Sequence, residues 1–203
     1  DDVRRLTNFS TGKLGSQLAN LLTARGHTVT LLLGYYAVYR GEQKAREIQT
    51  FTTTADLSDR LQKVAGQPPA EAVFHAAAVS DFTFGKVWER LPSGNLAELR
   101  AGKISTRQGT LLAELIPTTK IIGKLRQWFP NARLVGWKYE VDGDRDQLLA
   151  KAEQQIAENK TDACVANGRA YGAGFGLVTV PGRSVHLLHQ EALFEALEKL
   201  VGA

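Results

Sequence analysis

The chain has 203 residues, of which 43% are hydrophobic and 23% are charged, and this balance excludes a disordered chain, a collagen and a disulfide scaffold. No run of 18 apolar residues could span a membrane, and residues 1–5 are too charged for a signal peptide. The net charge of +4 fits phosphorylated small molecules as well as nucleic acid, and it is not clustered enough to choose between them. The single cysteine, Cys164, cannot form an internal disulfide, so we expect a reducing, cytoplasmic compartment.

The first part of the chain alternates helical and strand patterns. Leucines at helical spacing predict a helix that opens with a Ser10-Thr11 cap and closes at Arg25-Gly26-His27. Apolar and β-branched runs then predict strands at 28–33, 48–53 and 72–77, with a helix at 55–65. Residues 83–103 show no clear period and contain Gly and Pro, so we interpret them as a long mobile flap.

The second part continues the alternation. Pro117 is expected at the start of a helix whose apolar stripe includes Ile121 and Leu125. The remaining pattern predicts strands at 110–115, 134–137, 163–166, 177–180 and 185–188, and helices at 144–158 and near the C-terminus. This order predicts an α/β protein with a Rossmann-like, doubly wound and mostly parallel sheet and a small extra β region. We expect residues 1–203 to form a single domain.

The first strand is missing from this pattern. In a doubly wound sheet a glycine-rich turn follows the first, central strand. Here residues 10–15 lead into a helix with no strand before them, and the first residue is not Met. We therefore expect a strand and a glycine-rich turn upstream of residue 1.

Polar residues gather before the first helix, in the segment Asn-Phe-Ser-Thr-Gly-Lys-Leu-Gly at 8–15. Free N–H groups and the helix dipole attract anions there, and Gly12 permits a close approach. The spacing matches neither a Walker A loop nor Gly-x-Gly-x-x-Gly. Anion binding and a plain helix cap both remain open from the residues alone.

A second polar point follows the strand at 72–77. Small residues, Ala77 and Ala78 among them, lead to Asp81, and ligands in α/β sheets bind outside the carboxyl ends of strands. Asp81 either faces such a ligand or caps a turn. His75 lies in the apolar run and is interpreted as a core histidine. Lys103, at the end of the flap, either closes on a charged ligand or is a solvated surface lysine.

Cys164 lies in a predicted buried strand, which favours a structural thiol over a nucleophile.

Taken together, these segments resemble phosphopantothenoylcysteine synthetase (phosphopantothenate–cysteine ligase), the ligase half of the bacterial coenzyme A flavoproteins. The resemblance covers nearly the whole chain and rests on the motifs at 2–15, 77–82, 102–105, 117–122, 134–140 and 162–167. In that family a strand and a Gly-Gly-Thr turn precede the first motif, in agreement with the expectation above.

The resemblance implies a two-step ligation. The carboxylate of 4′-phosphopantothenate attacks the α-phosphate of CTP, or of ATP, and releases pyrophosphate. The amine of cysteine then displaces the nucleotide to form an amide. Mg²⁺ offsets the triphosphate charge. The resemblance also implies a homodimer and an association with a flavin-dependent decarboxylase, whose FMN is not expected on this chain.

Site roles follow residue by residue from the match. Asn8 and Lys103 are implied as catalytic residues, Asn8 at the activated carbonyl and Lys103 on the triphosphate. Substrate contacts are implied for Arg4 (from the neighbouring subunit), Asn8, Ala78 and Asp81. Nucleotide contacts are implied for Gly12, Ala77, Asp81, Lys103, Pro117, Lys120 and Trp137. No protein metal ligand is expected.

The chain departs from the family at several charged positions. Ser105 stands where a second flap lysine is common, and Gln155 and Asn159 stand where two helix lysines are common. Lys151 and Lys160 lie nearby in the sequence and are candidates to replace them.

Three alternative functions remain. The missing lysines favour a non-catalytic nucleotide-binding homologue. A nicotinamide-dependent oxidoreductase lacks support because Gly-x-Gly-x-x-Gly is absent, and a DNA-binding protein lacks support because no basic helix occurs.

Overall fold

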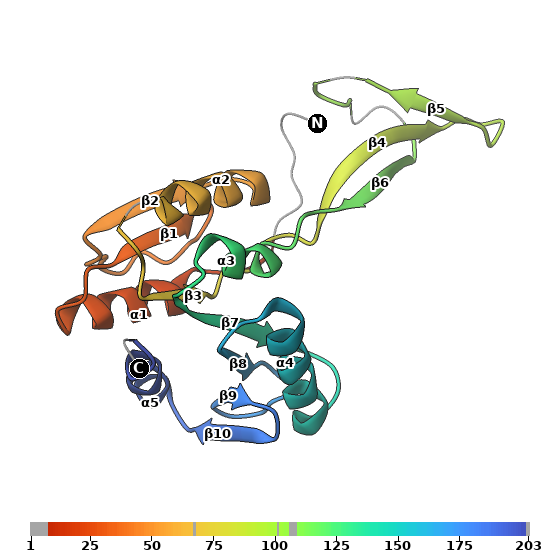
Figure 1. Cartoon of the computed structure of the whole chain (residues 1–203). Helices are drawn as coiled ribbons and strands as arrows, with labels where there is room; N and C mark the ends of the chain where they lie inside the picture. Colours follow the sequence, from red (N-terminus) through yellow and green to blue (C-terminus); the bar gives the residue numbers. More distant parts are fainter. Residues whose placement is uncertain (1–7, 67, 101, 106–108, 202–203) are drawn as a thin grey trace. The chain divides into compact units, whose positions relative to one another are not determined.

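The computed structural model describes residues 8–66, 68–100, 102–105 and 109–201, which fall into two compact units (Figure 1). The larger, here called the sheet unit, contains residues 10–77 and 121–203. The smaller, here called the arm unit, contains residues 1–9 and 78–120. Among the described residues, all five helices belong to the sheet unit.

The sheet unit begins with a helix that follows a glycine. Helix α1 (Lys13–Ala24) has Gly12 as its N-cap, at a φ of 75°. The expected Ser10-Thr11 cap is therefore wrong in detail, because a left-handed residue ends the preceding turn and Thr11 contributes only an Oγ1 that accepts from the Lys13 N–H at 3.2 Å. Strands β1 (Thr30–Gly34) and β2 (Glu47–Phe51) then pair in parallel, and helix α2 (Thr54–Ala65) follows.

The other parallel strands form a second sheet. Strand β3 (Ala72–His75) pairs with β7 (Arg133–Tyr139), and β7 pairs with β8 (Ala163–Asn167). Helix α3 (Ile122–Trp128) precedes β7, and helix α4 (Arg145–Asn159) connects β7 to β8. The Asp144 carboxylate caps α4 by accepting from the Gln147 N–H at 2.9 Å.

An antiparallel hairpin and a last helix complete the sheet unit. Strand β9 (Phe175–Val180) pairs with β8 and with β10 (Arg183–Leu187), and helix α5 (Gln190–Glu198) follows. The sheet order is β10-β9-β8-β7-β3. The hairpin is the small extra β region that the sequence predicts.

Apolar cores lie on both faces of this sheet. Side chains of α1 and α5, such as Leu18 and Leu193, pack with Val135 and Val165 on one face. On the other face Leu148 and Ala152 of α4 pack with Cys164, Ala166 and Val178. Helices on both faces of a sheet with parallel strands define the α/β, Rossmann-like class, so the predicted fold class is confirmed. In the described residues, however, the parallel strands occupy two sheets, because β1 pairs only with β2.

The arm unit is a three-stranded antiparallel sheet. Its strands are β4 (Phe82–Arg90), β5 (Leu96–Leu99) and β6 (Leu111–Pro117), in the order β5-β4-β6 (Figure 1). The interpretation of residues 83–103 as a loop is therefore wrong, although their mobility stays a prediction. A register shift between Phe84 and Val87 breaks the alternation that would have indicated a strand.

Pro117 ends β6, and α3 begins only at Ile122, so the expected helix start at Pro117 is also wrong. Within the described part of the chain, none of the helices is both long and apolar enough to cross a membrane.

Candidate functional site

The arm unit brings several predicted site residues together around Asn8. The Asn8 Nδ2 donates to the carbonyl oxygens of Ala78 at 3.1 Å and of Val79 at 2.9 Å, across 70 residues of sequence. Asn8 and Ala78 are both exposed. Both amide protons are engaged, so a ligand can contact the Oδ1 of Asn8 without breaking these hydrogen bonds. An acyl oxygen could take one of these protons only by replacing a backbone carbonyl.

Thr118 ties the end of β6 to the same segment. Its Oγ1 donates to the carbonyl of Ser80 at 2.6 Å, and its N–H donates to the carbonyl of Asp81 at 2.8 Å. Pro117 pairs with Phe82 in the sheet register. Asn8, residues 78–81 and residues 117–118 therefore form one neighbourhood, here called the arm base. The Asp81 carboxylate is exposed there, which leaves it available to a ligand.

Two predicted cations of the arm unit are exposed. Lys103 precedes the buried Ile104, and Lys120 precedes the buried Ile121. Neither ammonium group forms an ion pair with the described residues. Arg4, the remaining predicted cation, lies outside the described residues.

In the sheet unit, Gly12 lies in a tight turn. A Cβ at Gly12 would come within 2.9 Å of both Ala37 and Leu33, and the φ of 75° disfavours any side chain. The N–H of Tyr39 donates to the Thr11 carbonyl at 3.0 Å, which holds the loop after β1 beside this turn. Gly12 has no side chain to cap α1, and the Lys13 N–H donates to Thr11 Oγ1, so the N–H groups of Leu14 and Gly15 are the ones suited to an anion.

Trp137 lies at the carboxyl half of β7, and Ala77 follows β3, the neighbouring parallel strand. The indole of Trp137 is partly buried against the core shared by α1 and α5. Its Nε1 is buried and finds no hydrogen-bond partner in the described part of the chain. These two residues and Gly12 belong to the sheet unit, whereas the other predicted site residues belong to the arm unit.

Gln155 and Asn159, which replace lysines of the family, form hydrogen bonds with other groups of the chain. Gln155 Nε2 donates to the Trp137 carbonyl at 3.2 Å, and its Oε1 accepts from the Cys164 Sγ at 3.0 Å. Asn159 Nδ2 donates to the Gln155 carbonyl at 2.7 Å. Burial raises the pKa of the Cys164 thiol to about 12, although Lys138 lowers it slightly, which agrees with a structural thiol.

Sequence reasoning named Lys151 but missed the cluster of charges that it joins at the end of β7. The carboxylate of Glu140 pairs with the Lys138 Nζ at 3.3 Å and with the Lys151 Nζ at 3.1 Å. Lys151 precedes Gln155 by one helical turn, and that spacing is the signal that could have linked it to the end of β7.

The described residues hold no group of three or more His, Cys, Asp or Glu side chains that could bind a metal ion. Desolvation lowers the pKa of His75 to about 4, so this histidine is neutral at pH 7.

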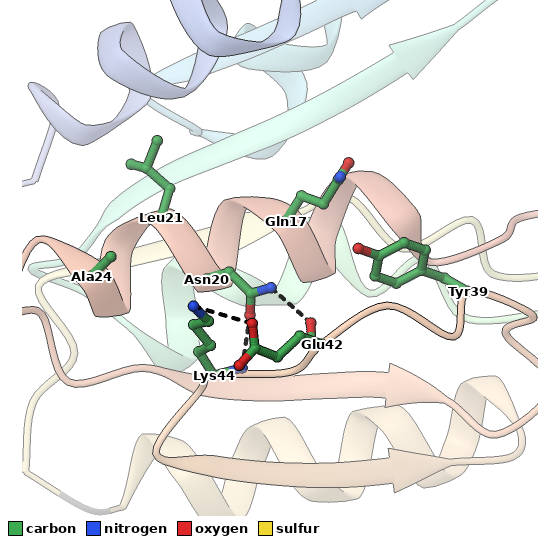
Figure 2. Close-up of a pocket in the computed structure, with 7 residues that line it drawn as sticks. All are labelled: Gln17, Asn20, Leu21, Ala24, Tyr39, Glu42 and Lys44. Atoms are coloured by element: carbon green, nitrogen blue, oxygen red, sulfur yellow. Dashed lines mark hydrogen bonds and ion pairs between the residues drawn. The ribbon is translucent and has the colours of Figure 1, made fainter.

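A shallow hollow of about 380 Å³ lies between α1 and the loop after β1 (Figure 2). Asn20 connects α1 to this loop, since its Nδ2 donates to the Glu42 carbonyl at 2.7 Å and its Oδ1 accepts from the Lys44 N–H at 2.7 Å. None of the predicted site residues lines this hollow.

The fold and the arm base define a class of protein: a Rossmann-like α/β domain with an antiparallel arm and with polar groups gathered after a parallel strand. The family model described as "DNA/pantothenate metabolism flavoprotein C-terminal domain" matches residues 1–200. The chain therefore belongs to this family, and the resemblance drawn from the motifs is confirmed.

Individual relatives agree. The coenzyme A biosynthesis bifunctional protein CoaBC of Thermococcus kodakarensis is 29% identical over 184 residues, which are 90% of this chain and 42% of that protein. The chain thus spans about two fifths of that relative. The crystal structure of the DNA/pantothenate metabolism flavoprotein from Streptococcus pneumoniae has 26% identity and a TM-score of 0.83, covering 98% of this chain and 91% of that one.

A structure of a Cab2 mutant in complex with phosphopantothenate-cysteine has a TM-score of 0.67 at 20% identity, covering 97% and 80% of the two chains. At this identity the likeness concerns the fold alone.

Proposed function

We propose that this chain is a phosphopantothenate–cysteine ligase that works through an acyl-nucleotidylate. The observation that carries the proposal is the arm base, where Asn8, residues 78–81 and Thr118 are hydrogen-bonded together within a family of coenzyme A biosynthesis proteins. The relative from Thermococcus is named for coenzyme A biosynthesis, and the Cab2 structure contains phosphopantothenate-cysteine.

The first step is nucleotidyl transfer. A carboxylate oxygen of 4′-phosphopantothenate forms a bond to the α-phosphorus of CTP or ATP, and the bond from that phosphorus to the bridging oxygen breaks to release pyrophosphate. Lys103 offsets charge on the leaving group, and Mg²⁺ supplied with the nucleotide shares this role. Gly12, Ala77, Asp81, Pro117, Lys120 and Trp137 line the nucleotide in this proposal.

The second step forms the amide. The cysteine nitrogen attacks the acyl carbon, the bond from that carbon to the phosphate-linked oxygen breaks, and the nitrogen loses a proton. Asn8 orients the acyl-nucleotidylate without adding charge, while Ala78 and Asp81 contact the pantothenoyl part and Arg4 of a second subunit binds its phosphate. The protein contributes position and electrostatics more than covalent chemistry.

Partners belong to the same proposal. We infer a homodimer and a flavin-dependent decarboxylase that takes the product onward. Exposed apolar side chains on the arm, Phe82, Phe84 and Leu115 among them, support a protein interface.

The test is product formation. The chain is incubated with 4′-phosphopantothenate, cysteine, Mg²⁺ and either CTP or ATP, and pyrophosphate and amide are measured separately. The proposal expects both products with at least one nucleotide, and neither product when phosphopantothenate is omitted.

A non-catalytic nucleotide-binding homologue is the second candidate, favoured by the internal use of Gln155 and Asn159. Nucleotide binding without pyrophosphate release from either nucleotide would support it instead.

A further inference from the structure

The charge cluster after β7 consists of one carboxylate between two ammonium groups. Partial burial raises the pKa of Glu140, but Lys151 and Lys138 lower it more, so the net pKa lies below its usual value. The cluster therefore carries a net charge of about +1 over the whole neutral range. The side chain of Glu140 is 23% exposed, whereas those of Lys138 and Lys151 are 35% and 47% exposed. The side chain of Glu140 is thus the most buried of the three.

Strand and helix periodicity set the position of this cluster. Alternation along β7 puts Lys138 on the same face as Gly136, which approaches Gln155 of α4. Lys151 lies one turn before Gln155 on α4, so it reaches the same strand about 6 Å nearer the carboxyl end. Figure 1 shows α4 lying along β7 and β8.

The cluster also lies where α/β sheets bind ligands. The N–H of Glu140 donates to the carbonyl of Asn167, the last residue of β8, at 3.2 Å. Glu140 directly follows the end of β7 at Tyr139. Both parallel strands therefore end beside the two lysines, and the crevice outside such ends is the usual ligand site.

Lys160 occupies a different place. It follows the last residue of α4 in a left-handed conformation, and its carbonyl accepts from Arg126 Nε at 3.0 Å. It precedes β8, at the opposite end of that strand from Asn167. Of Lys151 and Lys160, Lys151 is therefore the one that lies at the carboxyl ends of β7 and β8.

We propose that Lys138 and Lys151 bind the polyphosphate chain of the nucleoside triphosphate, and that Glu140, which pairs with both ammonium groups, competes with the phosphate oxygens for them. The proposal rests on the proposed function, because the ligase reaction supplies the triphosphate. Each lysine has three N–H donors, and a single shared carboxylate leaves most of them for phosphate oxygens. Glu140 takes no part in the chemistry and limits the affinity of the two lysines for phosphate.

The test measures binding of inorganic tripolyphosphate by calorimetry at low salt. Lys138→Gln and Lys151→Gln should each weaken binding about tenfold, since each removes one charge-assisted contact. Glu140→Gln should strengthen binding several-fold, because it releases both ammonium groups and raises the local charge. In turnover, the lysine variants should raise KM for the nucleotide about tenfold and change kcat little.

A matched ion pair provides the control. Lys44 pairs with Glu42 at 3.1 Å and is 48% exposed, which matches Lys151, although Glu42 is 72% exposed and Glu140 only 23%. Lys44→Gln and Glu42→Gln should leave tripolyphosphate affinity unchanged. Unfolding temperatures of all five variants, compared with the parent, separate loss of a contact from loss of structure.

Two outcomes overturn the inference: tripolyphosphate affinity unchanged in both lysine variants, or affinity lowered in Glu140→Gln as in the lysine variants. Its failure is distinguishable from that of the ligase proposal. If the parent chain forms amide but the lysine variants keep the parent KM, only the inference fails. If tripolyphosphate binding responds as expected but neither nucleotide yields pyrophosphate, the ligase proposal fails and the anion site stands.

Discussion

Asn8 is the residue whose contacts make the sharpest mechanistic prediction. Its amide protons both go to the carbonyls of Ala78 and Val79. Asn8→Asp would replace these donors with a carboxylate facing two carbonyl oxygens and a negatively charged intermediate. We expect amide formation to fall more than pyrophosphate release, with the intermediate leaking into solution. Separate assays of pyrophosphate and amide measure the difference.

Lys103→Gln should have a different effect from Asn8→Asp on the two measured products, pyrophosphate and amide. Losing one charge-assisted contact to the leaving group typically costs roughly 10²- to 10³-fold in rate, so pyrophosphate release itself should slow. Asn95→Asp, at an exposed turn of the arm, is the control for the negative charge that Asn8→Asp adds, and it should leave both products unchanged. Parent rates for both Asn8→Asp and Lys103→Gln would remove these residues from the mechanism.

The desolvation of His75 should make the stability of the folded chain depend on pH. Its pKa is about 4 in the folded chain, against an ordinary value of 6.5, because desolvation disfavours the charged ring. Below pH 6.5 the unfolded chain binds a proton that the folded chain does not. The free energy of unfolding is therefore unaffected by His75 above pH 6.5. It decreases as the pH drops toward 4, by at most about 3 kcal/mol.

Urea unfolding of the parent and of His75→Gln between pH 7.5 and 4 checks this prediction. The free-energy difference between the two proteins should shift by that amount across the window, in favour of the variant at low pH. A constant difference would show that His75 is not desolvated.

At the residue scale, burial was predicted better than side-chain contacts were. Cys164 was expected to be buried because it lies in a predicted buried strand, and it is fully buried. The pairing of Lys138 and Lys151 with Glu140 could not be predicted, because it depends on which turn of α4 lies over the end of β7. Gln155 was recognised as a departure, but its bonds to Trp137 and Cys164 depend on tertiary packing.

At the element scale, Gly136 controls how α4 packs on β7. A Cβ there would overlap Gln155 Oε1 and come within 2.8 Å of Ile122 Cδ1. Gly136→Ala should therefore destabilise the chain by about 1–3 kcal/mol through overpacking. Denaturant unfolding measures the loss, and the double variant Gly136→Ala with Gln155→Ala should recover part of it.

Gly15 is the matched glycine, since a Cβ there meets nothing within 4 Å. It lies inside α1, so Gly15→Ala should stabilise the chain by about 0.5–1 kcal/mol. An equal effect of alanine at both positions would contradict the close packing of α4 on β7.

Elements with a clear period were predicted well, and the arm was not. Strands such as β7 and β8 are continuous apolar runs because both faces are covered. In the arm, β4 has Gly85 beside a register shift, and Leu115 and Ile116 are both exposed, so neither face of the arm is marked by burial. Pro117 was misplaced because a proline suits the end of an edge strand as well as the start of a helix.

At the scale of the whole molecule, the proposed homodimer has a testable contact. Phe84 pairs with Leu115 in the arm, and these side chains are 39% and 50% exposed. If this patch is the interface, Leu115→Lys should shift the chain from dimer toward monomer in sedimentation velocity. Leu188→Lys, at a side chain 74% exposed in the sheet unit, should leave the dimer intact. A parent chain that is monomeric at micromolar concentration would contradict the proposed dimer.

The overall class followed from the sequence, while the grouping of strands did not. Alternating elements predicted an α/β sheet with helices on both faces, and the two apolar cores agree. A separate β1–β2 pair and a separate arm depend on which strands exchange hydrogen bonds, and strand pairing is not encoded in local periodicity.

Oxygen transfer from the carboxylate tests the proposed ligation most directly. Phosphopantothenate labelled with ¹⁸O in its carboxylate is incubated with the chain, cysteine, Mg²⁺ and the preferred nucleotide, and the products are analysed by mass spectrometry. Because the carboxylate oxygen that bonds to the α-phosphorus stays there when the amine displaces the nucleotide, the nucleoside monophosphate should gain one ¹⁸O for each amide formed. Label in inorganic phosphate, or amide formed with an unlabelled monophosphate, would contradict an acyl-nucleotidylate.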